Sequence, residues 1–338
     1  MFLWKRSSSV GQKPIFTSSR RWHKVVQTSA DTDRVVFLNP FTCGIYKDGA
    51  ARYKIDPETG SRIDEIDNQL GEYVDQFLST GDAPSVVRAS LEDVFDRRIL
   101  VPRYYDDRWQ SDFLKLIDRE GLASVSLGEL EDNGTIRVRG GHGSPSNDNR
   151  SGDIPYIKVS DIRSLRINVN PTNLVTEAVA RSFWKDSNSG LEPWDLVTPN
   201  RASSNIGEFA LLLPGDEHVV ITKEVFVIRV MRGQDDGWDP FYLLWALCLK
   251  AVRRQWQRIT LMQTNREDVG DRYKEILIPQ PRDAEWAKCV SAPFRHYFQT
   301  IAEARAEFSS VLANSGFDYI ASAHSAVPVA EHKATLAD

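Results

Sequence analysis

Segment 152–161 places strand-forming residues directly before a polar run. Ile154, Tyr156 and Ile157 are residue types that favour strands, and Lys158, Ser160 and Asp161 follow or flank the last apolar position. This pattern predicts a short strand that ends in a polar turn, a position at which loops commonly carry binding residues.

Other segments predict a mixture of strands and helices. Residues 34–38 are predicted to form a buried strand, and Asp48-Gly49 is typical of a hairpin turn. Residues 61–82 are predicted to form one helix, and Ser90 is a candidate N-cap for a second, short helix. The apolar face of the helix over 61–82 consists of Ile63, Ile66, Leu70, Val74, Phe77 and Leu78.

The C-terminal half contains the strongest helical periodicity. Residues 239–257 carry an apolar stripe with a proline in the first turn, and we expect that stripe to pack in a core. Residues 283–312 predict a second long helix, kinked at Pro293. Residues 319–338 look like a frayed tail.

Composition narrows the class of protein. The 338 residues are 41% hydrophobic and 26% charged, so the chain has the composition of a globular protein of about two domains. Three widely spaced cysteines suggest neither a disulfide framework nor a metal site, and a reducing compartment is expected. No apolar run is long enough to span a bilayer, so we expect a soluble, cytoplasmic protein. The basic first 30 residues fit a flexible arm or an organellar transit peptide.

Four segments in order resemble one protein family. Beside the strand at 152–161 stand Leu-Glu-Pro-Trp-Asp-Leu-Val-Thr-Pro-Asn-Arg-Ala at 191–202, Ser-Ser-Asn-Ile-Gly-Glu at 203–208, and Asn-Arg-Glu-Asp-Val-Gly at 265–270 with Ile-Leu-Ile-Pro-Gln-Pro at 276–281. Together they resemble the target recognition domain of type I restriction-modification specificity subunits, a module also appended to adenine-N6 DNA methyltransferases. The strand and turns of 34–60 resemble the end of the catalytic domain of those methyltransferases.

The resemblance implies a mixed α/β fold. We expect a single target-recognition-type globular domain with a long C-terminal helix, preceded by a small methyltransferase-tail-like segment. The expected boundaries are 1–82 for the methyltransferase-like segment, 83–281 for the recognition domain, 282–318 for the spacer helix and 319–338 for the tail.

A catalytic role is not expected. Asn39-Pro40-Phe41 lacks the second proline of the loop that holds a flipped adenine in methyltransferases of this kind. Gly140-Gly141-His142-Gly143 is followed by a polar loop rather than a helix, so it does not resemble a nucleoside-cofactor loop. We therefore expect no cofactor and no metal in this chain, with S-adenosylmethionine used by a partner methyltransferase.

The expected ligand is double-stranded DNA. The net charge of −5 argues against DNA binding, but basic residues outnumber acidic ones between Lys250 and Lys274. Arg201 and Asn205 could read base edges through paired hydrogen bonds, and the other candidates would bind phosphates or bases. The full set of expected DNA-binding residues is Arg137, Arg139, Lys158, Ser160, Arg163, Arg201, Ser203, Ser204, Asn205, Arg253, Arg254, Arg258 and Arg266.

Two other functions stay open at this point. The chain could be the DNA-recognising C-terminal part of a split adenine-N6 DNA methyltransferase, or a protein-interaction module that does not bind DNA. The interpretation that we prefer is that the chain is the DNA-specificity component of a restriction-modification or related phage-defence system. Its expected partners are a DNA methyltransferase subunit, a restriction subunit, or a second copy of the chain paired through the C-terminal helix.

Overall fold

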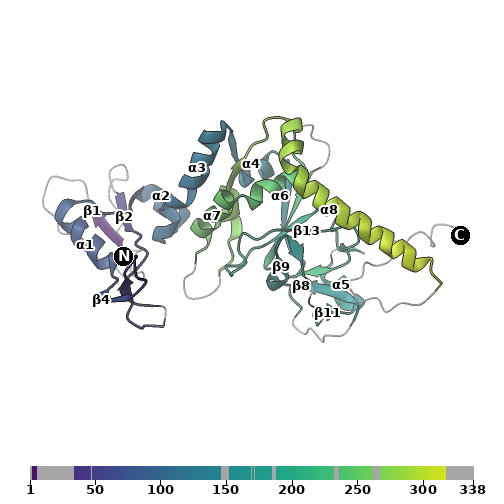
Figure 1. The fold of residues 1–338 in the computed structure, drawn as a ribbon, viewed down its shortest axis with the longest axis horizontal. Helices are drawn as coiled ribbons and strands as arrows, with labels where there is room; N and C mark the ends of the chain where they lie inside the picture. The colour runs from purple at the N-terminus through teal and green to yellow at the C-terminus, as the bar shows by residue number, and fades with distance from the viewer. Residues whose placement is uncertain are drawn as a thin grey trace. The chain divides into compact units, whose positions relative to one another are not determined.

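The structure is a computed structural model that describes residues 2–5, 34–46, 48–145, 152–168, 170, 172–184, 188–231, 236–261 and 267–316 (Figure 1). The predictions for residues 6–30, for the tail and for Arg266 lie outside the described residues. Helices and strands are both present, as the mixed α/β prediction requires. The chain divides into two compact units, 1–108 and 109–338.

The first unit is built on a three-stranded antiparallel sheet. Its strands are β1 (Phe2–Lys5), β2 (Arg34–Leu38) and β5 (Val86–Ser90), with β2 in the centre. The prediction of a buried strand at 34–38 is confirmed, because every residue after Arg34 is buried. Since β5 returns to pair with β2, the first unit extends to residue 108, past the expected boundary at 82.

The predicted helix over 61–82 is wrong in its first half. Residues Arg62–Ile66 form strand β4, which pairs with β3 (Tyr53–Ile55), and helix α1 spans only Gln69–Thr80. Asn68 caps α1, because its side chain accepts a hydrogen bond from the Gly71 N–H at 3.1 Å. Ile63 and Ile66 therefore have helical spacing to Leu70 but lie in a hairpin.

Two further elements complete the first unit. Helix α2 (Leu91–Arg97) begins at Ser90, whose hydroxyl accepts a hydrogen bond from the Asp93 N–H at 3.0 Å, so the predicted N-cap is confirmed. A 3₁₀ turn, Pro102–Tyr105, stacks Tyr105 on Phe37 of β2 with ring centroids 4.6 Å apart. This contact ties the end of the unit to its sheet.

The second unit contains two larger sheets that share a core, and two sheets of two strands each. The four-stranded antiparallel sheet has the order β13 (Ala210–Leu211), β12 (Leu196–Pro199), β15 (Val225–Val230) and β7 (Ile136–Gly140). The three-stranded sheet has the order β11 (Leu174–Val175), β8 (Ile154–Ile157) and β14 (Val220–Ile221), with β8 and β14 parallel. The two-stranded sheets pair β9 (Ile162–Arg163) with β10 (Arg166–Ile167) and β6 (Ser124–Ser126) with β16 (Leu277–Pro279). The remaining short elements are α4 (Leu127–Asp132) and the 3₁₀ turns Val159–Asp161 and Gly270–Glu275.

The strand predicted at 152–161 is confirmed as β8 followed by a 3₁₀ turn. Successive side chains of β8 point to opposite faces, so Ile157 packs with Val197 and Val227 of the larger sheet. Ile154 and Tyr156 point the other way. They face Ala180 of α5 (Glu177–Phe183) and Trp184, the C-cap residue of that helix. Strand β8 is thus buried on both faces.

The helices of the second unit correct one prediction and confirm another. The expected helix over 239–257 is two helices, α6 (Pro240–Cys248) and α7 (Lys250–Ile259), because the backbone of Leu249 is extended at ψ 129°. Asp239 caps α6 and α6 is buried on most sides, whereas α7 buries only one face. The long helix is confirmed as α8 (Ala284–Ala313), which packs on α6, and α3 spans Arg108–Glu120.

The two larger sheets of the second unit are joined where β7 ends. The Gly141 N–H donates to the Val225 carbonyl at 2.8 Å, and the His142 N–H donates to the Ile221 carbonyl at 2.8 Å. A side chain on residue 141 would place its Cβ 2.0 Å from the Thr222 carbonyl oxygen. Only glycine allows the backbone this close approach.

The junction yields a prediction about stability. Gly141→Ala should lower the free energy of unfolding by about 1–3 kcal/mol or more, because the new methyl group collides with backbone that cannot rotate away. Gly140→Ala is the matched control, since its Cβ would have nothing within 4 Å. Urea denaturation of both variants measures the difference, and equal stabilities would contradict the close approach.

Candidate nucleic-acid interface

A cavity of about 610 Å³ lies against the face of β7 and β15 that carries arginines. Arg137 and Arg139 are two residues apart on β7, so they share a face of the strand. Arg229 of β15 pairs in register with Arg137, which puts a third guanidinium on this part of the sheet. Residues 188–190 and Phe183 form other walls of the cavity.

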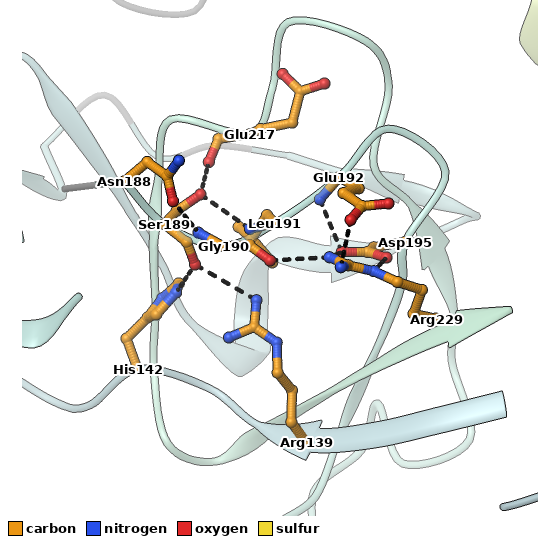
Figure 2. A network of polar contacts seen from close by, with 10 residues as sticks. All are labelled: Arg139, His142, Asn188, Ser189, Gly190, Leu191, Glu192, Asp195, Glu217 and Arg229. Atoms are coloured by element: carbon orange, nitrogen blue, oxygen red, sulfur yellow. Dashed lines mark hydrogen bonds and ion pairs between the residues drawn. The ribbon is translucent and has the colours of Figure 1, made fainter. Parts of the chain in front are cut away.

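Arg229 forms ion pairs and hydrogen bonds with other residues of the protein. Its Nε and Nη2 each lie 2.7 Å from the two Asp195 oxygens, its Nη1 lies 2.6 Å from Glu192, and Nη2 also donates to the Gly190 carbonyl (Figure 2). The Asp195 carboxylate, which is only 1% exposed, raises the pKa of Arg229. This arginine holds segment 190–195 on the sheet, and these bonds use four of its five N–H donors.

Arg139 is half-buried and has no carboxylate partner among the described residues. Its only described hydrogen bond is a 3.4 Å contact from Nη2 to the Ser189 carbonyl (Figure 2). Burial lowers the pKa of its guanidinium; the Asp195 charge opposes that change and the Arg229 charge adds to it. A guanidinium nevertheless stays protonated in proteins, so the cavity contains an uncompensated positive charge.

Arg137 lines the same cavity and is exposed. Within the described residues it forms no ion pair. Arg137 and Arg139 are therefore two predicted DNA-binding residues that the structure brings together.

His142 fixes the loop beside the arginines. Its Nδ1 accepts a hydrogen bond from the Ile221 N–H at 2.9 Å, so the proton must be on Nε2, which donates to the Ser189 carbonyl at 2.8 Å (Figure 2). Burial lowers the pKa of this imidazole, and the Arg139 charge acts in the same direction. His142 is thus a neutral bridge between the end of β7 and residue 189.

The polar turn after β8 is well ordered by its own hydrogen bonds. Asp161 accepts from the Lys158 N–H at 2.8 Å and from the Ser160 hydroxyl at 3.2 Å. The Lys158 ammonium donates to Asn173 at 3.0 Å, and the exposed Arg163 donates from Nε to the Ser160 carbonyl at 3.1 Å. Arg163 forms no ion pair with a carboxylate in the part of the chain that is described.

The loop at 200–208 differs from the sequence interpretation. The Arg201 guanidinium lies 2.8 Å from Glu224 and 2.9 Å from Asp268, so it joins three segments instead of pointing outward alone. Asn205 is buried, and its Nδ2 donates to the carbonyls of Val159 and Ile162 at 3.2 and 3.1 Å. A base contact by either side chain would require these bonds to open.

The two serines of this loop also bond within it. The Ser204 hydroxyl donates to the Asn205 Oδ1 at 3.0 Å, and the Ser203 hydroxyl accepts from the Asn205 N–H at 3.3 Å. Segment 203–208 therefore supports the turn at 158–163, because Asn205 donates hydrogen bonds to the backbone on both sides of Asp161.

The arginines of α7 are all paired with carboxylates. Arg253 lies 2.5 Å from Glu208, Arg254 pairs with Asp112, and Arg258 lies 2.7 Å from Glu275. The Arg258 side chain is only 13% exposed, so it does not share the surface of Arg253 and Arg254, which are 47% and 45% exposed. These three candidate DNA-binding residues therefore do not form one exposed basic surface.

The sequence interpretation missed the residues that shape the cavity. Arg229, its partners Glu192 and Asp195, and His142 were not among the predicted residues. A charged residue inside the apolar strand Val-Phe-Val-Ile-Arg-Val was the available signal for Arg229. Within the described residues no cluster of three or more metal-ligating side chains occurs, and each helix there is too short or too polar to cross a bilayer.

His142 predicts a pH dependence of stability. Because its pKa is lower in the folded state, the unfolded chain takes up a proton first as the pH falls below about 6.5, and folding loses free energy there. Urea denaturation from pH 8 to pH 5 should show wild type losing stability relative to His142→Gln. Parallel curves for the two proteins would contradict the neutral bridge.

No protein-family model and no curated protein matches the chain. Its structure is similar to the HsdS subunit from Thermoanaerobacter tengcongensis, at 15% identity over 74% of this chain and 58% of that one, with a TM-score of 0.34. It is also similar to the type I restriction-modification S subunit from M. genitalium (12% identity, 61% and 46% covered, TM-score 0.34) and to the type IIG restriction endonuclease BpuSI (10%, 66% and 33%, TM-score 0.39). The chain thus spans a little over half the length of the first of these subunits.

Proposed function

We propose that the chain is a DNA-recognition component of a restriction-modification or related defence system, non-catalytic itself and acting with a DNA methyltransferase that uses S-adenosylmethionine. The observation that carries this proposal is the pair Arg137 and Arg139, which face a 610 Å³ cavity without any carboxylate partner among the described residues. Uncompensated arginines at a concave surface attract phosphates and guanine edges.

The distribution of charge supports the same function. The chain is acidic overall, at −5, yet its acids neutralise the arginines of α7 and of loop 200–208 and leave Arg137, Arg139 and Arg163 without ion pairs in the described structure. The family-like segments at 152–161, 191–208 and 276–281 all belong to the second unit. Resemblance and charge thus favour the same part of the chain.

The proposed contacts fall into two groups. Arg137, Arg139 and Arg163 would contact DNA directly, because exposed or loosely bonded guanidiniums can reach it without breaking an ion pair. Arg253 and Arg254 would exchange a carboxylate for a phosphate, which costs little because exposed ion pairs contribute only about 0–1 kcal/mol.

A partner protein is proposed for the exposed apolar side chains of α8. Tyr297, Phe308 and Val311 are exposed there at 41%, 61% and 60%. Large apolar side chains on one exposed helix suit docking against another helix. We propose a methyltransferase subunit or a second copy of this chain as that helix's partner, with a restriction subunit as a further member of the complex.

The first test of the function is binding to duplex DNA. The full chain, alone and co-expressed with its methyltransferase partner, should retain a labelled duplex in fluorescence anisotropy, and log affinity should fall linearly with log salt. Three phosphate contacts correspond to a slope of about −2.7. The absence of salt-dependent binding by both preparations would overturn the proposal and favour the protein-interaction module.

A second test separates the exposed arginines of α7 from the buried one. The double variant Arg253→Gln/Arg254→Gln should flatten the salt slope by up to about 1.8 while leaving thermal stability nearly unchanged. Arg258→Gln should do the opposite, because it removes a largely buried ion pair with Glu275 and little surface charge. Salt titrations and thermal unfolding of both variants check this, and equal effects would contradict the assignment.

A further inference from the structure

We propose that the cavity beside β7 is a nucleotide-binding site, in which Arg137 and Arg139 take the phosphate and the remaining walls take the sugar and base. The ligand is one nucleotide of a nucleic-acid strand, so this inference rests on the proposed function and assigns it a particular pocket.

The charge of the site specifies an anion. Arg229, the third guanidinium at this surface, is neutralised by Asp195 and Glu192, whereas the hydrogen bond that Arg139 makes within the described residues goes to a backbone carbonyl at 3.4 Å. His142 is held neutral, so it neither adds a charge nor offers a free donor. The net positive charge facing the cavity therefore comes from Arg137 and Arg139, whose planar guanidiniums match phosphate oxygens.

The size of the cavity specifies more than a bare anion. About 610 Å³ exceeds what one phosphate fills and lies in the range of roughly 300–1,000 Å³ that small-molecule sites occupy. Phe183 supplies a partly exposed aromatic wall against which a base can stack. Asn188 accepts from the Gly190 N–H at 3.0 Å through Oδ1, which leaves its amide N–H groups to donate to a base edge (Figure 2).

The site is rigid before a ligand arrives. Segment 189–190 is held by the His142 side chain from one side and by Arg229 from the other, and the His142 N–H bonds the Ile221 carbonyl of β14 just after β7 ends. These walls are already ordered in the folded protein. Binding a ligand therefore costs little further conformational entropy.

The test uses the full chain with deoxynucleoside monophosphates and with inorganic phosphate, followed by isothermal titration calorimetry. At least one mononucleotide should bind more tightly than inorganic phosphate, and Arg139→Gln should weaken it by about 10- to 100-fold. Arg137→Gln is the second variant, because Arg137 is exposed and its loss should not affect folding. Arg119→Gln is the control, since it removes an exposed arginine from the same unit away from the cavity.

Competition between DNA and the mononucleotide shows whether the bound nucleotide belongs to a DNA strand. Saturating DNA should exclude the mononucleotide, and Arg139→Gln should flatten the salt slope of DNA binding by about 0.9. A mononucleotide that binds alongside saturating DNA would overturn the strand assignment in favour of a free nucleotide. Wild type that binds DNA but no mononucleotide, with unchanged slopes in both variants, would overturn the site and leave the proposed function standing.

Discussion

The ion pair between Arg229 and Asp195 is the interaction on which the rest of the second unit's surface depends. Asp195 ends the turn that begins at Glu192, and its carboxylate both accepts from the Glu192 N–H at 2.9 Å and binds Arg229. Trp194 occupies the third position of that turn at φ 73°, a conformation that usually needs glycine. Loss of one partner of a buried pair costs about 3–5 kcal/mol, so this contact can hold the strained turn in place. The same guanidinium binds the Gly190 carbonyl, and the wall of the cavity therefore depends on it.

The pairing of charges explains how an acidic protein can present a basic site. Several arginines that would otherwise contribute to a diffuse positive surface form ion pairs with carboxylates. The carboxylates are those of Glu224, Asp268, Glu208 and Asp112. Because exposed pairs are screened and weak, their main effect is on the pattern of potential and not on stability. Beside the cavity, a local excess of positive charge is left at Arg137 and Arg139, and the low-dielectric walls strengthen its field.

Local signals in the sequence predicted local structure well, and long-range pairing decided what they missed. Ser90 was predictable as a cap because an N-cap needs only its own next three residues. Ile63 and Ile66 have the spacing of a helix face, but pairing with residues 53–55 made them a strand. From the sequence, Arg201 was expected to be free to bind a base. Its carboxylate partners Glu224 and Asp268 lie 23 and 67 residues away, so the residues next to Arg201 in the sequence do not indicate them. Arg137 and Arg139 stay predicted DNA-binding residues, and only the fold distinguishes them from the arginines that are paired with carboxylates.

The site also shows why glycine and a neutral histidine follow β7. The two larger sheets meet at Gly141, and the backbone N–H groups of residues 141 and 142 donate to the carbonyls of Val225 and Ile221. His142 adds hydrogen bonds through both ring nitrogens, which is possible only for a neutral imidazole. A charged imidazole there would donate from both nitrogens and repel both the Ile221 N–H and the Arg139 guanidinium. Because His142 is neutral, it adds no charge to that of Arg139 beside the cavity, so the junction that joins the sheets also contributes to the electrostatics of the site.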